Sequence, residues 1–301
     1  MKAKVMLIGG EGYIGNIIQS ISSKKLEFFS YDINIKNKNS FLDVLDKNKV
    51  HNEINKINPD IVINLAARTD LNGRDINDYS VNWEGVQNVI ESIKAKNIWF
   101  IHFSTMLVCK LGHDLKNEMD YCPDTIYGES KVLSEKIVTN SKCDNWTIIR
   151  PTTVWGKKAK FPYSFFISIV RNIGFIELDI FSAKRDFCHE DFAKILLESM
   201  LSSFVDKKIT FHKKIFYLTD TQPSSINDLA RISTKLYGGK TYKLPTFLNR
   251  FLNAQLIIFA KLGDILDKVF KIKFIMNTRR LKNMQTQSRL DKNMSKLIET
   301  K

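Results

Sequence analysis

A tyrosine and a lysine stand four residues apart in the segment Tyr127-Gly128-Glu129-Ser130-Lys131. On a helix this spacing places both side chains on one face. A phenol ionises at about pH 10, so a tyrosine that exchanges protons at neutral pH needs a nearby cation, which Lys131 is spaced to provide. The hydroxyl of Thr105, after an apolar run, can hydrogen-bond the same substrate oxygen and steady its developing charge. These three residues predict acid–base chemistry at a substrate oxygen.

A glycine-rich turn near the N-terminus predicts a cofactor. Gly9, Gly12 and Gly15 form the pattern G-x-x-G-x-x-G after the apolar run 5–8, and a helix-periodic segment follows. In a strand–turn–helix unit such glycines turn the chain, admit a pyrophosphate close to the backbone, and let the helix pack against the strand. The N–H groups and the positive dipole end of the helix N-terminus attract the phosphates. The turn therefore predicts a dinucleotide site.

An acidic residue refines the choice of dinucleotide. The next predicted strand, 26–31, ends at Asp32. A carboxylate about 20 residues past such glycines can accept hydrogen bonds from the adenosine ribose, and it would repel a 2′-phosphate. The sequence therefore predicts NAD rather than NADP, although a solvated loop aspartate would look the same.

The elements that must position these residues alternate along the first half of the chain. Predicted strands end at the glycine turn, at Ala66-Ala67, at Ser104-Thr105 and at Arg150-Pro151. Because the carboxyl ends of parallel strands meet at one edge of a sheet, these residues should lie together. The pattern predicts an α/β fold, a Rossmann-type doubly wound parallel sheet with a smaller C-terminal substrate-binding lobe.

The alternation also predicts two domains. We expect 1–155 to form the NAD-binding Rossmann domain, to which a segment at about 181–200 returns, and 156–301 to form the substrate-binding lobe. Within that lobe, 244–276 has apolar residues at three- and four-residue steps and basic residues on its other face. This amphipathic segment could pack on its own lobe, pair with a second copy, or make peripheral contact with a membrane surface.

Composition excludes several classes of protein. The 301 residues, 44% of them hydrophobic, suit a globular protein. The net charge of +14 comes from scattered lysines, and the short basic runs lack interleaved aromatic residues, so we expect no specific nucleic-acid binding. The four cysteines have neither metal-site spacing nor a disulfide pattern, so no metal is expected.

The same features predict a cytoplasmic protein. Cysteine usage fits a reducing compartment, and no apolar leader segment precedes the first predicted strand. The longest clean apolar run in the C-terminal part, 256–260, is too short to span a bilayer. Peripheral contact with the inner membrane surface through 244–276 remains an open interpretation.

Several motifs recur here in one order, and together they are more specific than any one alone. They are the glycine turn, Asp32, Asn64-Leu65-Ala66-Ala67, Asn82, Ser104-Thr105, Tyr127 with Lys131, and Arg150-Pro151. In these the chain resembles the extended short-chain dehydrogenase/reductase family, and within it the NAD-dependent epimerase/dehydratase branch that acts on nucleotide sugars. The resemblance covers about 3–195, and a looser match, Ser288-Arg289-Leu290-Asp291, follows near the end.

The resemblance implies roles for particular residues. Tyr127 would be the catalytic acid/base, Lys131 its electrostatic partner and Thr105 the hydroxyl that helps it. The implied cofactor-binding residues, with Asp43-Val44 flanking the adenine, are Gly9, Gly12, Tyr13, Ile14, Gly15, Asp32, Asp43, Val44, Leu65, Ala66, Ala67, Asn82, Tyr127, Lys131 and Pro151. The implied substrate-binding residues are Thr105, Thr153 and Arg185. The guanidinium of Arg185 suits a diphosphate, although a surface ion pair is the alternative.

A departure from the family pattern narrows the chemistry. Met106 and Leu107 stand where dehydratases of this branch carry Asp-Glu, and neither can transfer a proton, so dehydration is not expected. What remains is hydride transfer, in which Tyr127 takes the proton of a sugar hydroxyl, at C4, while the hydride passes to NAD.

We therefore expect an NAD-dependent nucleotide-sugar epimerase that acts at C4 through a 4-keto intermediate in surface-glycan precursor synthesis. An NAD(P)-dependent nucleotide-sugar 4-ketoreductase or dehydrogenase is the first alternative. A dehydrogenase/isomerase of sterol-like alcohols and a non-catalytic NAD-binding sensor are the others. The resemblance further implies a homodimer.

Overall fold

The computed structural model describes residues 2–34, 40–113, 115–206, 211–270, 276–288 and 290. The chain divides into two compact units. The first comprises Met1–Val154 and Cys188–Asp220, and the second comprises Trp155–Phe187 and Thr221–Leu290. Each unit is thus built from segments that are separate in the sequence.

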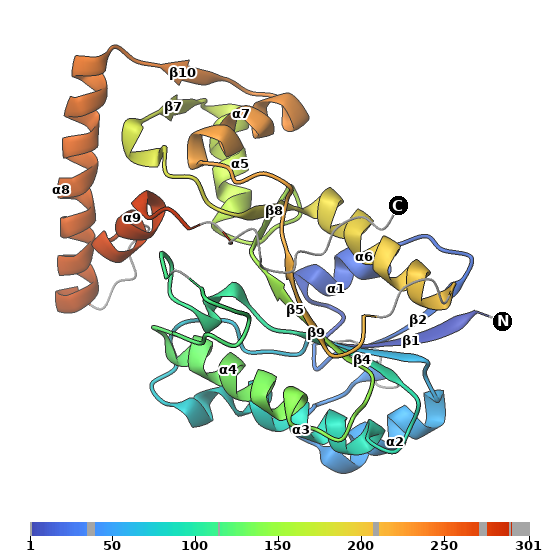
Figure 1. The fold of residues 1–301 in the computed structure, drawn as a ribbon. Coiled ribbons are helices and arrows are strands. Elements are labelled where there is room, and N and C mark those ends of the chain that lie inside the picture. Colours follow the sequence, from blue (N-terminus) through green and yellow to red (C-terminus); the bar gives the residue numbers. More distant parts are fainter. Residues whose placement is uncertain are drawn as a thin grey trace. The chain divides into compact units, whose positions relative to one another are not determined.

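The first unit is organised around a parallel sheet (Figure 1). Six described strands form it in the order β2-β1-β3-β4-β5-β9. Their bounds are β1 (Ala3–Ile8), β2 (Leu26–Tyr31), β3 (Ile61–Asn64), β4 (Trp99–Phe103), β5 (Trp146–Pro151) and β9 (Lys214–Leu218). The strand order reverses between β1 and β3, the switch point at which open α/β sheets bind ligands. The predicted Rossmann-type doubly wound sheet is confirmed.

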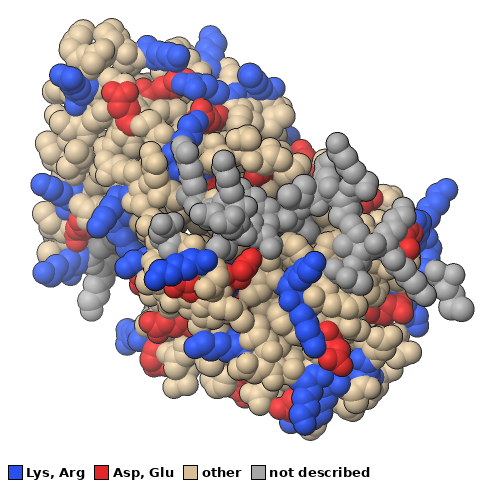
Figure 2. Space-filling view, viewed as in Figure 1, with Lys and Arg blue, Asp and Glu red and all other residues tan. Residues whose placement is uncertain are grey.

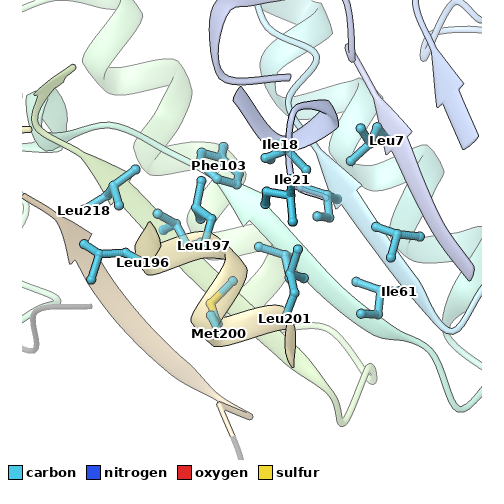
Figure 3. Packing of buried hydrophobic residues seen from close by; sticks show 14 of the residues in the cluster. Leu7, Ile18, Ile21, Ile61, Phe103, Leu196, Leu197, Met200, Leu201 and Leu218 are labelled. Carbon is cyan, nitrogen blue, oxygen red and sulfur yellow. The ribbon is translucent and has the colours of Figure 1, made fainter. Parts of the chain in front are cut away.

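Helices cover both faces of this sheet. On one face lie α1 (Tyr13–Gln19) and α6 (Glu190–Val205), and on the other lie α2 (Lys47–Ile57), α3 (Ser80–Ile93) and α4 (Ile126–Thr139). Successive residues of a strand point to opposite faces, so Val5 and Leu7 join one core while Met6 and Ile8 join the other. Figure 3 shows the first core, where Leu197 of α6 packs among side chains from the sheet and α1. Burial on both faces explains why the strands read as unbroken apolar runs.

The pairing register aligns the carboxyl ends of the central strands β1, β3 and β4. Ile8 of β1 pairs with Asn64 of β3, and Asn64 pairs in turn with His102 of β4. The glycine turn, the loop after Asn64 and the Ser104-Thr105 segment therefore begin at nearly the same height. This is the edge at which the sequence places its functional residues.

The second unit is smaller. Its elements are α5 (Tyr163–Asn172), β7 (Phe175–Glu177), the short 3-10 helix η4 (Asp179–Phe181), α7 (Ile226–Tyr237), β10 (Thr241–Lys243), α8 (Thr246–Phe270) and α9 (Thr278–Gln285). Strands β7 and β10 are parallel, and the core contains Trp155, Ile167, Phe187, Ile226 and Leu229. The short strands β6 (Thr153–Trp155) and β8 (Phe187–His189) pair with each other.

The remaining predictions about organisation can be compared with these bounds. Helix α2 begins at Lys47 because Asp46 caps it, and Phe41, before it, forms a bridge with Asp32. The amphipathic segment 244–276 contains α8, and its residues 271–275 lie outside the described part. The roles assigned to the two predicted domains stay predictions.

No described helix combines the length and apolar character needed to cross a bilayer. Within the same residues, no group of three or more His, Cys, Asp and Glu side chains is arranged to hold a metal ion.

Candidate active site

The glycine turn after β1 touches the loop after β3. Gly9 has a φ of +85°, a conformation that favours glycine, and a Cβ placed on it would lie 2.5 Å from the backbone nitrogen of Ala66. Only a glycine allows the two loops to approach this closely. The contact confirms that the two segments lie together at the switch point of the sheet.

Gly12 differs from its neighbours because the protein itself leaves room for a side chain there. A Cβ at Gly12 would meet no described atom closer than 3.4 Å, whereas a Cβ at Gly15 would lie 2.2 Å from the carbonyl oxygen of Gly10. Gly15 is therefore needed for the packing of α1. Packing within the chain does not require a glycine at position 12, and the dinucleotide predicted for this turn would use the space beside it.

The residues at the start of α1 face the protein. The Tyr13 hydroxyl donates to Glu190 Oε2 of α6 at 2.7 Å, and Ile14 packs against the core. These contacts fix α1 against α6. Any contact of Tyr13 or Ile14 with a cofactor would therefore come from the backbone.

Asp32 is a buried carboxylate that holds the glycine turn. Its Oδ2 accepts the N–H of Glu11 at 3.0 Å, and its Oδ1 accepts the N–H of Asn34 at 2.8 Å. Each oxygen retains a further lone pair. The acidic group thus lies beside the turn, where the sequence predicts the ribose.

The Asp43-Val44 pair is fixed by a residue that the sequence analysis missed. Val44 is buried against Gly85 of α3, and its carbonyl oxygen accepts Asn88 Nδ2 at 2.9 Å. Asp43 accepts the N–H of Leu45 at 2.9 Å. Asn88 is buried on α3, and an amide that stands among apolar residues of a helix is the signal that could have identified it.

Two buried polar atoms at the strand ends lack partners within the described chain. Asn64 accepts the N–H of Ala66 through Oδ1 at 3.2 Å, but its Nδ2 has no partner there, and neither has Ser104 Oγ. An unpartnered buried donor costs free energy unless a ligand or water meets it. Together with the space at Gly12, these atoms fit the polar groups of a dinucleotide. Leu65, Ala66 and Ala67 beside them are partly buried.

The side chain of Asn82 links two segments of the protein by hydrogen bonds. It is fully buried, and its amide exchanges two hydrogen bonds with the backbone of Arg68, at 2.8 and 3.0 Å. Its Nδ2 also donates to Ser130 Oγ of α4 at 2.9 Å. The side chain expected to bind the cofactor thus joins the loop after β3 to the helix that carries Tyr127.

Tyr127 and Thr105 form a buried hydroxyl pair. Tyr127 lies in the first turn of α4, which Thr125 caps by accepting the N–H of Gly128 at 3.0 Å. Burial raises the pKa of Tyr127 to about 12, although its side-chain hydrogen bond with Thr105 acts to lower it. The phenol therefore holds its proton at neutral pH.

Lys131 lies one helical turn further on and is also buried. Its Nζ donates to the carbonyl oxygen of Phe103 at 2.8 Å, and burial lowers the pKa of the ammonium to about 8. The sequence analysis expected Lys131 to lower the pKa of Tyr127. The structure differs because burial, which disfavours charge on both groups, dominates each pKa.

A buried cluster behind these residues was not predicted. Arg150, at the end of β5, is fully buried, and its guanidinium contacts both carboxylate oxygens of Glu135 on α4. Its Nη1 donates to the hydroxyl of Tyr217 at 2.8 Å. Pro151 follows, partly buried. The cluster ties the helix of Tyr127 and Lys131 to the sheet.

Two of the predicted substrate residues, Thr153 and Arg185, belong to different units of the chain. Thr153 is partly buried in β6. Arg185, in the second unit, donates through Nη1 to the carbonyl oxygen of Asn283 at 3.2 Å, and its guanidinium lies 5.5 Å from the ring centroid of Phe187. Its contacts among described residues include no carboxylate, and its buried Nε has no partner there. The surface ion pair considered as an alternative is not found.

The looser C-terminal motif is only partly described, because Arg289 and Asp291 lie outside the described residues. Ser288 accepts the N–H of Asp186 through its carbonyl oxygen at 3.2 Å, and Leu290 donates its N–H to Asp186 Oδ2 at 2.6 Å. The motif thus packs beside Arg185 in the second unit.

Comparison with known proteins identifies relatives. Residues 3–236 match the family model described as RmlD substrate binding domain. GDP-6-deoxy-D-talose 4-dehydrogenase of Aggregatibacter actinomycetemcomitans is 26% identical over 215 residues, which cover 68% of this chain and 72% of that protein.

Solved structures share the fold. The dTDP-4-dehydrorhamnose reductase of Bacillus anthracis strain Ames, in complex with NADP, has a TM-score of 0.67 at 19% identity, over 82% of this chain and 85% of that one. The UDP-glucuronic acid 4-epimerase of Bacillus cereus, in complex with NAD, has a TM-score of 0.62 at 20% identity, over 80% of this chain and 87% of that one. Structures of this fold thus occur with either dinucleotide.

Proposed function

Because the chain belongs to the RmlD substrate binding domain family, we propose that it is an NAD(P)-dependent oxidoreductase that acts at C4 of a nucleotide-linked sugar. In this reaction a 4-keto sugar and a 4-hydroxy sugar are interconverted by transfer of one hydride and one proton. The 4-dehydrogenase relative supports this choice over the C4 epimerase, which was the first interpretation of the sequence. The catalytic residues would be the same for both.

The observation that carries the proposal is the buried pair of hydroxyls at Thr105 and Tyr127, with Lys131 one turn behind. In the reducing direction Tyr127 gives its proton to the C4 oxygen, and Thr105 hydrogen-bonds the same oxygen. The raised pKa of Tyr127, about 12, keeps that proton in place at neutral pH. The resting protein is thus prepared for reduction of a ketone.

The cofactor would occupy the switch point. When bound, NAD(P) supplies or accepts the hydride. The space beside Gly12 would receive its phosphates, and Asn64 Nδ2 and Ser104 Oγ would gain the partners that they lack in the described chain. Since the carboxylate of Asp32 lies beside the same turn, we propose that NAD is preferred over NADP.

Two features support the proposed substrate and reaction: the positive charge of Arg185, and the absence of an acidic residue at Met106 and Leu107. Arg185 is a partly buried cation without a carboxylate partner among the described residues, which suits a nucleotide diphosphate. Met106 and Leu107, in the short 3-10 helix after Thr105, cannot protonate a leaving hydroxyl. We therefore propose hydride transfer without dehydration.

Turnover assays test this function. The purified protein is supplied with NADH or NADPH and 4-keto-6-deoxy sugars linked to GDP, dTDP or UDP, and loss of absorbance of the reduced nicotinamide is followed. We expect net oxidation of the cofactor and a 4-hydroxy product by NMR. Interconversion of two 4-hydroxy sugars with no net oxidation or reduction of the cofactor would instead support the epimerase function. Turnover of apolar alcohols alone would favour the sterol-like alternative.

Three further measurements address the remaining predictions. Tight NAD(H) binding without turnover of any sugar in the panel would favour the sensor. The homodimer and the cytoplasmic location stay predictions, to be tested by light scattering on the purified chain and by cell fractionation.

A further inference from the structure

Helix α8 exposes a stripe of large apolar side chains. Between 51% and 75% of the surface of each is exposed, and the stripe consists of Phe247, Phe251, Ile258, Leu262, Ile265 and Val269. With about 100° between successive residues of a helix, these six positions fall within a sector of about 60°. Scattered single apolar residues are common on surfaces, but a continuous stripe along 25 residues is not.

The stripe points away from the body of the second unit. On the opposite side of α8, Asn249 accepts the N–H of Asp179 at 3.2 Å and donates to the carbonyl oxygen of Glu177 at 3.4 Å. Ala260, about three turns further along that side, is fully buried. The helix is therefore anchored by one face while the apolar stripe remains uncovered.

A row of basic residues runs beside the stripe. Arg250, Lys261 and Lys268 are exposed, and their spacing of eleven and seven residues places all three on the same flank. The carboxylate of Asp264 is engaged by the N–H of Thr278 at 3.2 Å. Figure 2 shows Lys and Arg side chains spaced along the edge where α8 lies, with an acidic side chain and uncharged surface between them.

The uncharged surface continues into a groove on the other flank. A cavity of about 410 Å³ lies between α8 and the β7–η4 segment, and its lining includes Ile176, Leu178, Leu256 and Phe259. The lining is almost wholly apolar, with Gln255 as its polar member. Stripe and groove together form one apolar surface bordered on one side by positive charge.

We propose that α8 lies flat on a membrane surface that contains anionic lipids. The apolar stripe enters the boundary between headgroups and acyl chains, and the basic row meets the lipid phosphates. The helix would extend about 37 Å along the surface. The helix is amphipathic rather than apolar all round.

Charge favours a bilayer over a second copy of the chain. Two α8 helices paired antiparallel through the stripe would bring one basic row against the other. In a parallel pair, each basic row would face the flank of Gln255 and Phe259, which offers no carboxylate. An anionic lipid surface supplies the opposite charge along the whole row.

Vesicle flotation of the full chain tests the proposal, and its readout does not depend on turnover. Vesicles of phosphatidylcholine are compared with vesicles in which about a third of the lipid is phosphatidylglycerol. We expect binding to the anionic vesicles alone, weakened by added salt. Phe251→Ser with Leu262→Ser should lower binding about 100-fold or more. Lys261→Glu with Lys268→Glu should lower it at least about 30-fold.

Matched controls separate α8 from general effects of charge and hydrophobicity. Phe165→Ser with Ile195→Ser removes two exposed apolar side chains of other helices, and Lys24→Glu with Lys94→Glu reverses two exposed charges of the first unit. Both pairs should bind anionic vesicles like the unchanged chain. Circular dichroism checks that each variant folds, and the charge reversals on α8 alter only exposed side chains.

Two outcomes would overturn the proposal. One is that the chain stays unbound with anionic vesicles, or that the control pairs lose as much binding as the α8 pairs. The other is a dimer in sedimentation velocity, without vesicles, that Phe251→Ser with Leu262→Ser dissociates. In that case a second copy covers the stripe.

Discussion

Arg150 contacts both carboxylate oxygens of Glu135, through Nε at 2.8 Å and Nη2 at 2.6 Å, and both side chains are fully buried. Glu135 lies one turn beyond Lys131 on α4, and Arg150 ends β5. The pair therefore fixes the helix that carries the predicted acid–base residues against the edge of the sheet. The Glu135 carboxylate also acts to raise the pKa of Lys131, against the larger effect of burial.

The first prediction follows from this ion pair. Glu135→Gln leaves a buried guanidinium without its counter-charge, and removing one partner of a buried pair costs roughly 3–5 kcal/mol. We expect the free energy of unfolding in urea to fall by that amount. Glu129→Gln, at an exposed position of the same helix, should change it by no more than about 0.5 kcal/mol. Equal effects at the two positions would contradict the structural role of the pair.

Tyr127→Phe tests the proton donor. The change removes one hydroxyl from a buried ring, so the fold should persist, while loss of the catalytic proton should lower kcat by about 10²–10⁴-fold. Steady-state kinetics with the sugar nucleotide measures this. Tyr242→Phe, at an exposed position of β10, serves as the control. Unchanged kcat in Tyr127→Phe would remove the proposed mechanism and leave only the fold.

The buried ammonium of Lys131 predicts a dependence of stability on pH. Its pKa is about 8 in the folded protein against an ordinary 10.5, so between these values the unfolded chain binds more protons than the folded one. Stability from this group therefore rises as the pH increases from 8 to 10.5, by roughly 3 kcal/mol.

Urea unfolding at both ends of this range measures the effect, with Lys131→Met as the reference because it removes the titrating group. The wild type should gain stability relative to the variant as the pH rises. A constant difference between the two proteins would show that the ammonium is not buried.

Two glycines of one turn should respond differently to the same substitution. Gly9→Ala places a side chain at a positive φ and against the backbone of Ala66, so we expect a lower melting temperature. Gly12→Ala has room within the protein, so the melting temperature should hold. Its Kd for NAD(H) should rise at least about tenfold, because the methyl group enters the proposed phosphate site. Unaltered binding in Gly12→Ala would place the cofactor elsewhere.

Local patterns were enough to predict the sheet and one edge of the site. The strand at 61–64 could be predicted because a strand that is buried on both faces appears in the sequence as a continuous apolar run. Thr105 and Tyr127 could be brought together because one ends a strand and the other begins the next helix. The conclusion needed only the direction of parallel strands.

Long-range partners could not be predicted in the same way. Tyr217, which contacts Arg150, belongs to β9, and only the completed sheet brings the two together. Asn82 shows a second limit, because an amide that binds a backbone looks the same in the sequence as one that binds a cofactor. The pKa of Tyr127 likewise depends on burial, which the four-residue spacing from Lys131 does not reveal.

Because the first unit is built from separate segments of the chain, a simple truncation cannot produce it as an isolated domain. A fragment that ends at 155 would lack α6 and β9. Such a fragment would present β5 as an open sheet edge and uncover the part of one apolar face that α6 covers, both of which promote aggregation. During synthesis, too, the first unit is complete only with the segment that ends at Asp220, after the first part of the second unit has already emerged from the ribosome.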